Sequence, residues 1–354
     1  MKKFIKIGAV VLSMALAMTT LASCADAYSQ KKKYLDAVDS YTFWSNDLSQ
    51  SIPQPNIGKM VEKFLAAPSA DSKAKKVAII GYDGCRSETL VNVLESGATD
   101  PKDKNKGDYS GHKEESVCSG INKLVKEGGK VYHTFAGGYK GEENEQHCST
   151  APGWAAILTG AWGIENGITD NGMPKSINHK TLLLKAAEDY GMSTTFCASW
   201  EPHFTENYVD EIQYLKENPQ IPMNFNHVET DAALHEYLLD CVTVGSPNEK
   251  DIIFGIYEAT DHNGHNTGFG NRNSKYVTAF RDEDERCYQL LNAIQNRSTY
   301  DQEDWLIVVT ADHGGIKTWH GGQTIEERST WLVCNKPIDE KYFVSGYDGY
   351  NLKK

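Results

Sequence analysis

The chain has 354 residues, with 36 basic and 48 acidic side chains, a net charge of -12 and 40% hydrophobic residues. A chain of this length and composition can bury a large core, which excludes a disordered tail and a small disulfide scaffold. The acidic balance also argues against binding of duplex nucleic acid, because neutralising phosphates requires clustered Lys and Arg. An anionic substrate would therefore need positive charge that is supplied locally, for example by metal ions.

Residues 1–23 have the pattern of an export signal. Lysines at positions 2, 3 and 6 precede an apolar run over residues 7–21, which is too short for an ordinary membrane span. The run ends in Leu21-Ala22-Ser23-Cys24, which resembles the signal of bacterial lipoproteins, where the cysteine becomes the lipidated first residue. This resemblance predicts lipidation of Cys24, and a protein that is exported and anchored to the membrane of the bacterial cell envelope, outside the cytoplasm. The alternative is an ordinary signal peptide with a chance cysteine.

Residues 24–75 are polar and rich in lysine, with a short helix expected around Ile57–Leu65. We expect this segment to be a tether that packs partly onto a domain formed by residues 76–354. That domain begins with Val77–Ile80, a short apolar run rich in β-branched residues that leads into Gly81-Tyr82-Asp83-Gly84. This pattern indicates a buried strand followed by a turn.

The remaining elements alternate between helices and strands. Helical patterns each precede an apolar run typical of a buried strand, with helices expected at 181–190, 231–242 and 274–297 and strands at 193–198, 251–257 and 305–310. This alternation predicts an α/β fold with a doubly wound, mostly parallel sheet and helices on both faces. Two segments, at about 101–147 and 200–227, break the pattern. Loops of this length predict lid-like insertions that form walls above a site.

Carboxylates and histidines follow three of the predicted strands, where open parallel sheets bind their ligands. These six side chains are Asp83, Asp261, His265, Asp312, His313 and His320. Imidazole and carboxylate groups in this mixture bind divalent metal ions, with zinc favoured and manganese the alternative. Two such ions about 4 Å apart can clamp the attacking and leaving oxygens of a displacement at phosphorus. The sequence therefore predicts a site for two metal ions at this edge of the sheet.

The candidate nucleophile lies at a helix start. In residues 148–160, two adjacent hydroxyl residues at 149 and 150 are followed by a proline suited to a first helical turn, an apolar stretch and a glycine stop. A hydroxyl at this place faces free backbone N–H groups and the positive end of the helix dipole, which suits a phosphoryl group. The alternative is that Ser149 or Thr150 only caps the helix.

Together these segments resemble the alkaline phosphatase superfamily, and within it the type I phosphodiesterase/nucleotide pyrophosphatase branch, over about residues 76–335. The resemblance implies an alkaline-phosphatase-like fold and an enzyme that hydrolyses phosphodiesters or nucleotide pyrophosphates. Its implied nucleophile is Thr150, which forms a covalent phosphothreonine that water then hydrolyses. The ligands implied for one metal ion are Asp83, Thr150, Asp312 and His313, and those for the other are Asp261, His265 and His320.

The block after Thr150 departs from the branch. The branch has Phe-Pro-Asn-His at this place, where the Asn holds a phosphate oxygen, whereas this chain has Ala151-Pro152-Gly153-Trp154. One oxyanion donor is therefore missing or is supplied from elsewhere. Gly153 and Trp154 are the candidate substrate contacts in this block, with Trp154 either in the core or a platform for a substrate base.

The leading hypothesis is a surface lipoprotein that hydrolyses a small phosphate ester with two zinc ions. The nearest alternatives are a phosphomonoesterase or a phosphoethanolamine or phosphoglycerol transferase of the same superfamily. A sulfatase is disfavoured because threonine cannot become formylglycine. The alternative from another class is a non-catalytic lipoprotein that binds metal or solute. The oligomeric state stays open at this point.

Overall fold

The computed structural model describes residues 51–90, 119–172 and 176–344. Its strands are β1 (Ile52–Pro53), β2 (Ala74–Tyr82), β3 (Lys130–Phe135), β4 (Thr194–Ala198), β5 (Met223–His227), β6 (Ile252–Tyr257), β7 (Glu303–Ala311) and β8 (Ser329–Cys334). They form one eight-stranded sheet in the order β1-β3-β8-β7-β2-β6-β4-β5. Only β8 runs antiparallel to its neighbours β3 and β7, so the sheet is mostly parallel, as predicted.

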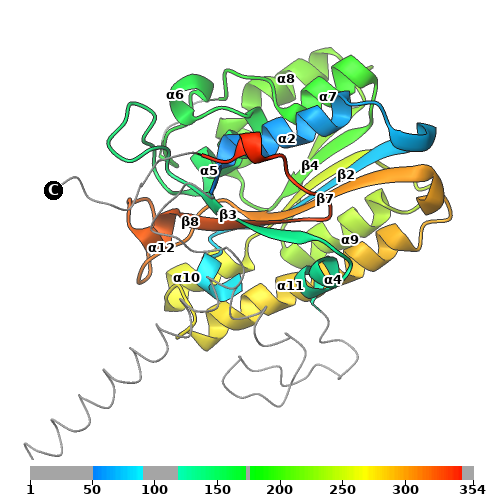
Figure 1. The fold of residues 1–354 in the computed structure, drawn as a ribbon. Helices are drawn as coiled ribbons and strands as arrows, with labels where there is room; N and C mark the ends of the chain where they lie inside the picture. The colour runs from blue at the N-terminus through cyan, green and yellow to red at the C-terminus, as the bar shows by residue number, and fades with distance from the viewer. Residues whose placement is uncertain (1–50, 91–118, 173–175, 345–354) are drawn as a thin grey trace, which may run out of the picture.

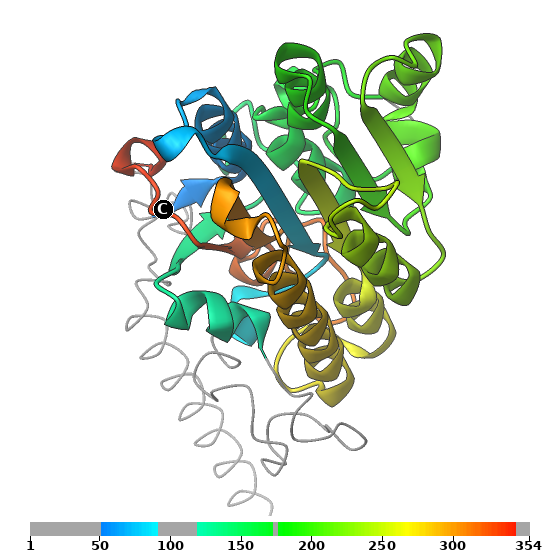
Figure 2. The same ribbon diagram turned by 90° about the vertical axis from the view of Figure 1, so that its right-hand side faces the viewer.

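Helices cover both faces of this sheet (Figures 1 and 2). One face carries α2 (Gln54–Ala66), α5 (Thr150–Thr159), α6 (Gly163–Asn166), α7 (Leu182–Tyr190) and α8 (Val209–Glu217). The other carries α4 (Gly120–Lys126), α9 (Asp231–Cys241), α10 (Ala259–Thr267) and α11 (Ser274–Gln295), and the short α12 (Ile325–Arg328) precedes β8. The predicted fold class is therefore confirmed.

The central strands explain why the sheet is buried on both sides. Val77 and Ile79 of β2 pack into the cluster under α2, α5 and α7, whereas Ala78 and Ile80 point to the cluster under α9 and α11. All four side chains are fully buried. A continuous apolar run is what a parallel strand between two helical layers requires, and this run made β2 readable from the sequence.

The helices begin and end where local sequence signals place them. In α7 the Thr181 hydroxyl accepts a hydrogen bond from the Leu184 N–H at 3.1 Å, and Gly191 ends the helix with φ 65°. Gly160 ends α5 in the same left-handed conformation, with φ 69°. These caps confirm the helix boundaries expected for both segments.

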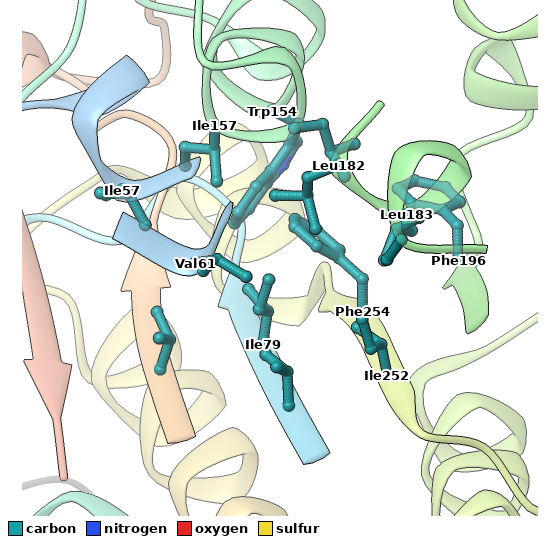
Figure 3. Packing of buried hydrophobic residues seen from close by; sticks show 14 of the residues in the cluster. Ile57, Val61, Ile79, Trp154, Ile157, Leu182, Leu183, Phe196, Ile252 and Phe254 are labelled. Carbon is teal, nitrogen blue, oxygen red and sulfur yellow. The ribbon is translucent and has the colours of Figure 1, made fainter. Parts of the chain in front are cut away.

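The segment expected as a tether is part of the domain wherever the structure describes it. The predicted helix is α2, and its Ile57 and Val61 are fully buried beside Ile157 of α5 (Figure 3). Strand β1 joins the edge of the sheet through β3. Residues 1–50, which include the predicted signal and Cys24, lie outside the described residues. Within the described ranges, no helix is long and apolar enough to cross a membrane.

Both segments expected as lid-like insertions instead contribute to the sheet, which corrects that prediction. In the described part of the first, α4 leads into β3, which pairs with β1 and β8. In the second, a π-helical turn at His203–Asn207 and α8 lead into the edge strand β5, which pairs with β4. Strands β3 and β5 are incompletely buried and mix polar with apolar residues, so they lack the continuous apolar run of the central strands.

Candidate active site

Two neighbouring strands place Asp83 and Asp312 side by side. Tyr82, at the end of β2, pairs with Ala311 of β7, so the next residue of each strand projects from the same edge of the sheet. The Nε2 atom of His313 lies 3.3 Å from Asp83 Oδ1 and 3.4 Å from Asp312 Oδ2. All three side chains are buried, and their ligand atoms lie within 4.8 Å of one another. They form the first candidate metal-ligand group.

The second candidate group consists of Asp261, His313 and His320. Asp261 lies on α10, and its Oδ1 atom is 3.8 Å from Nε2 of His320, which comes from the connection between β7 and β8. His265, one turn further along α10, has Nε2 3.3 Å from Asp261 Oδ2, and its ring centre lies 4.8 Å from that of His320. The six predicted metal-ligating side chains thus lie together, with His313 at the junction of the two groups.

Backbone carbonyls orient two of the histidines. Nδ1 of His313 donates to the Gly314 carbonyl at 2.6 Å, and Nδ1 of His265 donates to the Thr318 carbonyl at 3.0 Å. Because a carbonyl accepts only from a protonated nitrogen, each Nε2 can keep its lone pair directed toward the carboxylates. Metal-ligating histidines are usually held in this way.

The electrostatics of the cluster fit bound cations. Burial and the neighbouring Asp83 raise the pKa of Asp312 well above its ordinary value. Burial lowers the pKa of His313, but Asp312 and Asp83 outweigh this effect and raise that pKa to about 10. Asp312 Oδ2 and Asp261 Oδ1 have no hydrogen-bond donor among the described residues. Divalent ions would supply both the missing charge and the missing partners, so these residues fit a metal centre.

Thr150, the first residue of α5, lies at the first group. Its Oγ1 atom is 3.4 Å from Asp83 Oδ1 and 3.4 Å from His313 Nε2. The hydroxyl of Ser149 neither caps the helix nor has a partner among the described residues. Of the two hydroxyls, only that of Thr150 thus contacts the carboxylate and histidine.

Asn171 is a neighbour of the helix start that sequence reasoning missed. Its Oδ1 atom accepts a hydrogen bond from the Ala151 N–H at 2.8 Å. The carboxamide is thereby fixed beside Thr150, and its Nδ2 group remains a donor at the positive end of α5. No local signal marked Asn171, because it reaches α5 from a loop twenty residues downstream.

Gly153 and Trp154 are buried against candidate metal-ligand residues, which argues against the prediction that they contact a substrate. A Cβ atom at Gly153 would lie 2.9 Å from both Cβ and the carbonyl oxygen of Asp312, so α5 packs directly on that residue. Trp154 is fully buried, packs edge-on against Phe254 (Figure 3) and donates from Nε1 to Asp83 Oδ2 at 2.9 Å. Its indole therefore belongs to the core.

Two further residues at the site were missed. Nε2 of Gln54 donates to the backbone carbonyl of Asp312, from a segment that we expected to be a tether. Trp319 is 70% exposed, and its ring centre lies 5.4 Å from that of His265 and 6.0 Å from that of His320. Its position directly before the candidate ligand His320 in the sequence could have indicated it.

A pocket of about 890 Å³ lies beside α10 and the start of α9. Glu258, which lines it, directly follows β6, as Asp83 follows the adjoining β2. Burial, followed by the charge of Asp83, raises the pKa of Glu258 to about 8. The pocket therefore begins at a strand end that adjoins the one carrying Asp83.

Several solved structures are similar to this chain at low sequence identity. Murine ectonucleotide pyrophosphatase/phosphodiesterase 5 is 15% identical, with a TM-score of 0.40 over 68% of this chain and 57% of that chain. A protein in the alkaline phosphatase superfamily from Vibrio parahaemolyticus is 13% identical, with a TM-score of 0.46 over 80% of this chain and 69% of that chain. Alkaline phosphatase from the Antarctic bacterium TAB5 is 12% identical, with a TM-score of 0.41 over 74% of this chain and 91% of that chain. This chain thus spans less than two thirds of the murine protein, and no curated protein matches its sequence significantly.

The sequence itself provides the family assignment. Residues 148–332, more than half of the chain, match the type I phosphodiesterase/nucleotide pyrophosphatase family. The matched segment contains α5 with Thr150, α10 with Asp261 and His265, and the candidate ligands that follow β7. The chain therefore belongs to the type I phosphodiesterase/nucleotide pyrophosphatase family, a family of phosphoric ester hydrolases.

Proposed function

We propose that this protein hydrolyses phosphodiesters or nucleotide pyrophosphates, with Thr150 as nucleophile and two divalent metal ions, zinc in preference to manganese. The observation that carries the proposal is the position of Thr150 Oγ1, 3.4 Å from both Asp83 Oδ1 and His313 Nε2 at the start of a helix. A non-catalytic binding protein would have no use for a hydroxyl at this point. The family match supports the same reaction class.

The residues that would hold the ions are Asp83, Thr150, Asp312 and His313 for one, and Asp261, His265 and His320 for the other. Bound there, the ions would supply the positive charge that attracts the phosphate and stabilises charge on the leaving oxygen. The N-terminus of α5 adds the positive end of its dipole. An acidic protein can thus bind an anion at one local site.

The chain's own residues account for the covalent step. Thr150 Oγ1 forms a bond to phosphorus while the ester P–O bond breaks, and the leaving alkoxide takes the bonding electron pair and a proton from water. The hydroxyl proton of Thr150 passes to water, which balances the proton that the leaving alkoxide takes up and leaves Asp83 ionised as a metal ligand. Water then attacks phosphorus, restores the threonine hydroxyl and releases the phosphate product. Trp154 holds Asp83 in place through both steps.

Asn171 takes the role of oxyanion donor in this proposal. Its Oδ1 atom already accepts the Ala151 N–H, which leaves Nδ2 to donate to a non-bridging phosphate oxygen on Thr150. Position 153 cannot provide such a donor, because Asp312 occupies the space of any side chain there.

The test compares T150A and T150S with the wild type on bis(p-nitrophenyl) phosphate, with bound metal measured in each protein. We expect T150A to lose about 10³-fold or more in kcat, because alanine removes the nucleophilic hydroxyl. T150S should keep measurable activity, because serine retains a hydroxyl. T159A is the matched control, since Thr159 lies at the other end of the same helix and its hydroxyl bonds to Ala155, Ala161 and Asn166, away from the candidate metal ligands. Wild-type turnover by T150A would refute the proposal. An excess of an alcohol acceptor tests for transfer, which would appear as a new phosphodiester product.

We also propose that the enzyme acts outside the cytoplasm, anchored through a lipid on Cys24. The support is the sequence signal at residues 1–24. Labelling cells with a radioactive fatty acid should mark the wild-type protein and leave C24A unlabelled. Equal labelling of both proteins would contradict the proposed anchor.

A further inference from the structure

Helix α10 carries Asp261 and His265, yet its sequence is poorly suited to form a helix by itself. Its nine residues include Gly264, two asparagines and two threonines, which are weak helix formers. Isolated helices shorter than about 12–15 residues are marginal in water. Of the α10 residues, only Thr260 and Gly264 are buried, so apolar packing contributes little. The position of two candidate ligands must therefore depend on contacts from neighbouring elements.

Carboxylates from two other helices bind the N–H groups at the start of α10. Asp231, the first residue of α9, accepts from the N–H groups of Glu258 and Ala259, both at 3.0 Å. Glu283 of α11 accepts from the Thr260 N–H at 2.8 Å and from the Thr260 hydroxyl at 2.5 Å. The N-cap side chain of α10 makes no such bond. The two carboxylates thus satisfy backbone donors that a helix start leaves free.

Glu283 makes the more deeply buried of these contacts. Its side chain and Thr260 are both 0% exposed, and Thr260 directly precedes Asp261 in the sequence. Burial of a carboxyl group is unfavourable unless hydrogen bonds compensate for the lost water, and both oxygens of Glu283 are bound in this way. Because water cannot readily replace a lost partner, the two bonds fix the backbone one residue before a candidate ligand.

Helix α11 is itself fixed against the end of β2. The Tyr276 hydroxyl donates to the Gly84 carbonyl at 2.6 Å, and the Tyr82 hydroxyl donates to the backbone carbonyl of Glu283 at 3.4 Å. Tyr82 and Gly84 flank Asp83 in the sequence. Helix α11 therefore connects the strand end of the first candidate group with the helix start of the second.

We propose that Glu283 is a positioning residue for the second metal ion, the one assigned to Asp261, His265 and His320. It holds the start of α10 in place, and with it the two ligands that this helix carries. The inference rests on the proposed function, because it requires a site for two ions. Loss of a group that orients a metal ligand typically costs about 10- to 100-fold in metal affinity. Removal of the Glu283 carboxyl group should weaken the second ion by this factor and leave the first ion unchanged.

The test measures zinc retention and does not depend on activity. Zinc-loaded proteins compete with a chelator of known affinity, and mass spectrometry of the native proteins counts the ions that remain. E283A should release one of its two ions at about 10- to 100-fold higher free zinc than the wild type does. E283Q should retain both ions, because the amide oxygen can accept the Thr260 N–H and the amide NH₂ group can donate to the Thr260 hydroxyl.

The chain offers a matched control in Glu211. This buried carboxyl group accepts from the N–H of Thr181 at 3.0 Å and from its hydroxyl at 2.5 Å, the same arrangement at the start of another helix. That helix, α7, carries none of the candidate ligands. E211A should therefore retain zinc as the wild type does, although it loses equivalent hydrogen bonds.

A double-mutant cycle identifies the ion that is released. D261A removes a ligand of the second ion, so the addition of E283A to D261A should not weaken the remaining ion further. T260V serves as a second variant if E283A fails to fold, because it removes only the hydroxyl contact. It should weaken the same ion by a smaller factor than E283A.

Three results would overturn the positioning role: unchanged zinc retention in E283A and T260V, equal weakening of both ions in E283A, or the same loss in E283Q as in E283A. The failure of the proposed function looks different. A wild-type protein that binds only one zinc ion would refute the two-metal site itself. Two ions that both persist in E283A would refute the role of Glu283 alone.

Discussion

Replacing Trp154 with phenylalanine should weaken metal binding without changing the ligands themselves. Trp154 Nε1 donates to Asp83 Oδ2 at 2.9 Å, whereas the other oxygen of this carboxylate faces Thr150 and His313. Phenylalanine keeps an aromatic ring against Phe254 and Gly81 but removes this donor. Asp83 would then be free to rotate away from the metal-ligand group.

The size of the effect follows from burial. Trp154 is 0% exposed and Asp83 is 1% exposed, so water cannot readily replace the lost donor. A hydrogen bond to a charged group contributes about 1.5–3 kcal/mol, and loss of a group that orients a metal ligand typically costs about 10- to 100-fold in metal affinity. W154F should accordingly need about 10- to 100-fold more free metal for half-maximal activity.

The assay is the rate of bis(p-nitrophenyl) phosphate hydrolysis as a function of free zinc, set with a chelator buffer. At saturating zinc, W154F should approach the kcat of the wild type, because Thr150 and all the ligands remain. W162F is the matched control: Trp162 is also buried and loses the same part of its ring, but it packs in a separate cluster with Phe135 and Ala156. Equal zinc requirements for W154F and the wild type, or for W154F and W162F, would refute the reasoning.

Three more predictions concern single side chains. G153A should destabilise the protein by about 1–3 kcal/mol and weaken metal retention, because the new methyl group meets Asp312 at 2.9 Å; an unchanged Tm and metal content would contradict this packing. N171D should lower kcat by about 10²- to 10³-fold at unchanged metal content, because a carboxylate oxygen replaces the Nδ2 donor. The control N178D changes an exposed asparagine further along the chain and should have little effect on kcat. Burial raises the pKa of Glu211 from 4.5 to about 7, so the folded state favours the neutral carboxyl group. The contribution of this group to the free energy of unfolding is therefore complete below pH 4.5 and is lost as the pH rises through about 7. Chemical denaturation from pH 4 to 8 should show this loss, about 3 kcal/mol, in the wild type and not in E211Q; parallel curves would contradict it.

The sequence by itself determined the framework of the site. Continuous apolar runs are required in parallel strands that are covered on both sides, so β2, β6 and β7 could be predicted, and with them the strand ends that carry Asp83 and Asp312. The glycine stop at Gly160 defined the helix that starts at Thr150, because helix ends depend on local backbone conformation.

The tertiary structure alone decided how distant segments meet. Trp154 contacts Asp83, and Gln54 contacts Asp312, only because α5 and α2 cross the same face of the sheet. Strands β3 and β5 could not be recognised, because incomplete burial permits the polar residues that made their segments resemble loops. The sequence likewise could not rank its tryptophans by exposure, since burial of Trp154 and exposure of Trp319 depend on packing between elements far apart in the chain. Local patterns thus determined which chemical groups reach the edge of the sheet, and long-range packing determined which side chains around them are buried and which are exposed.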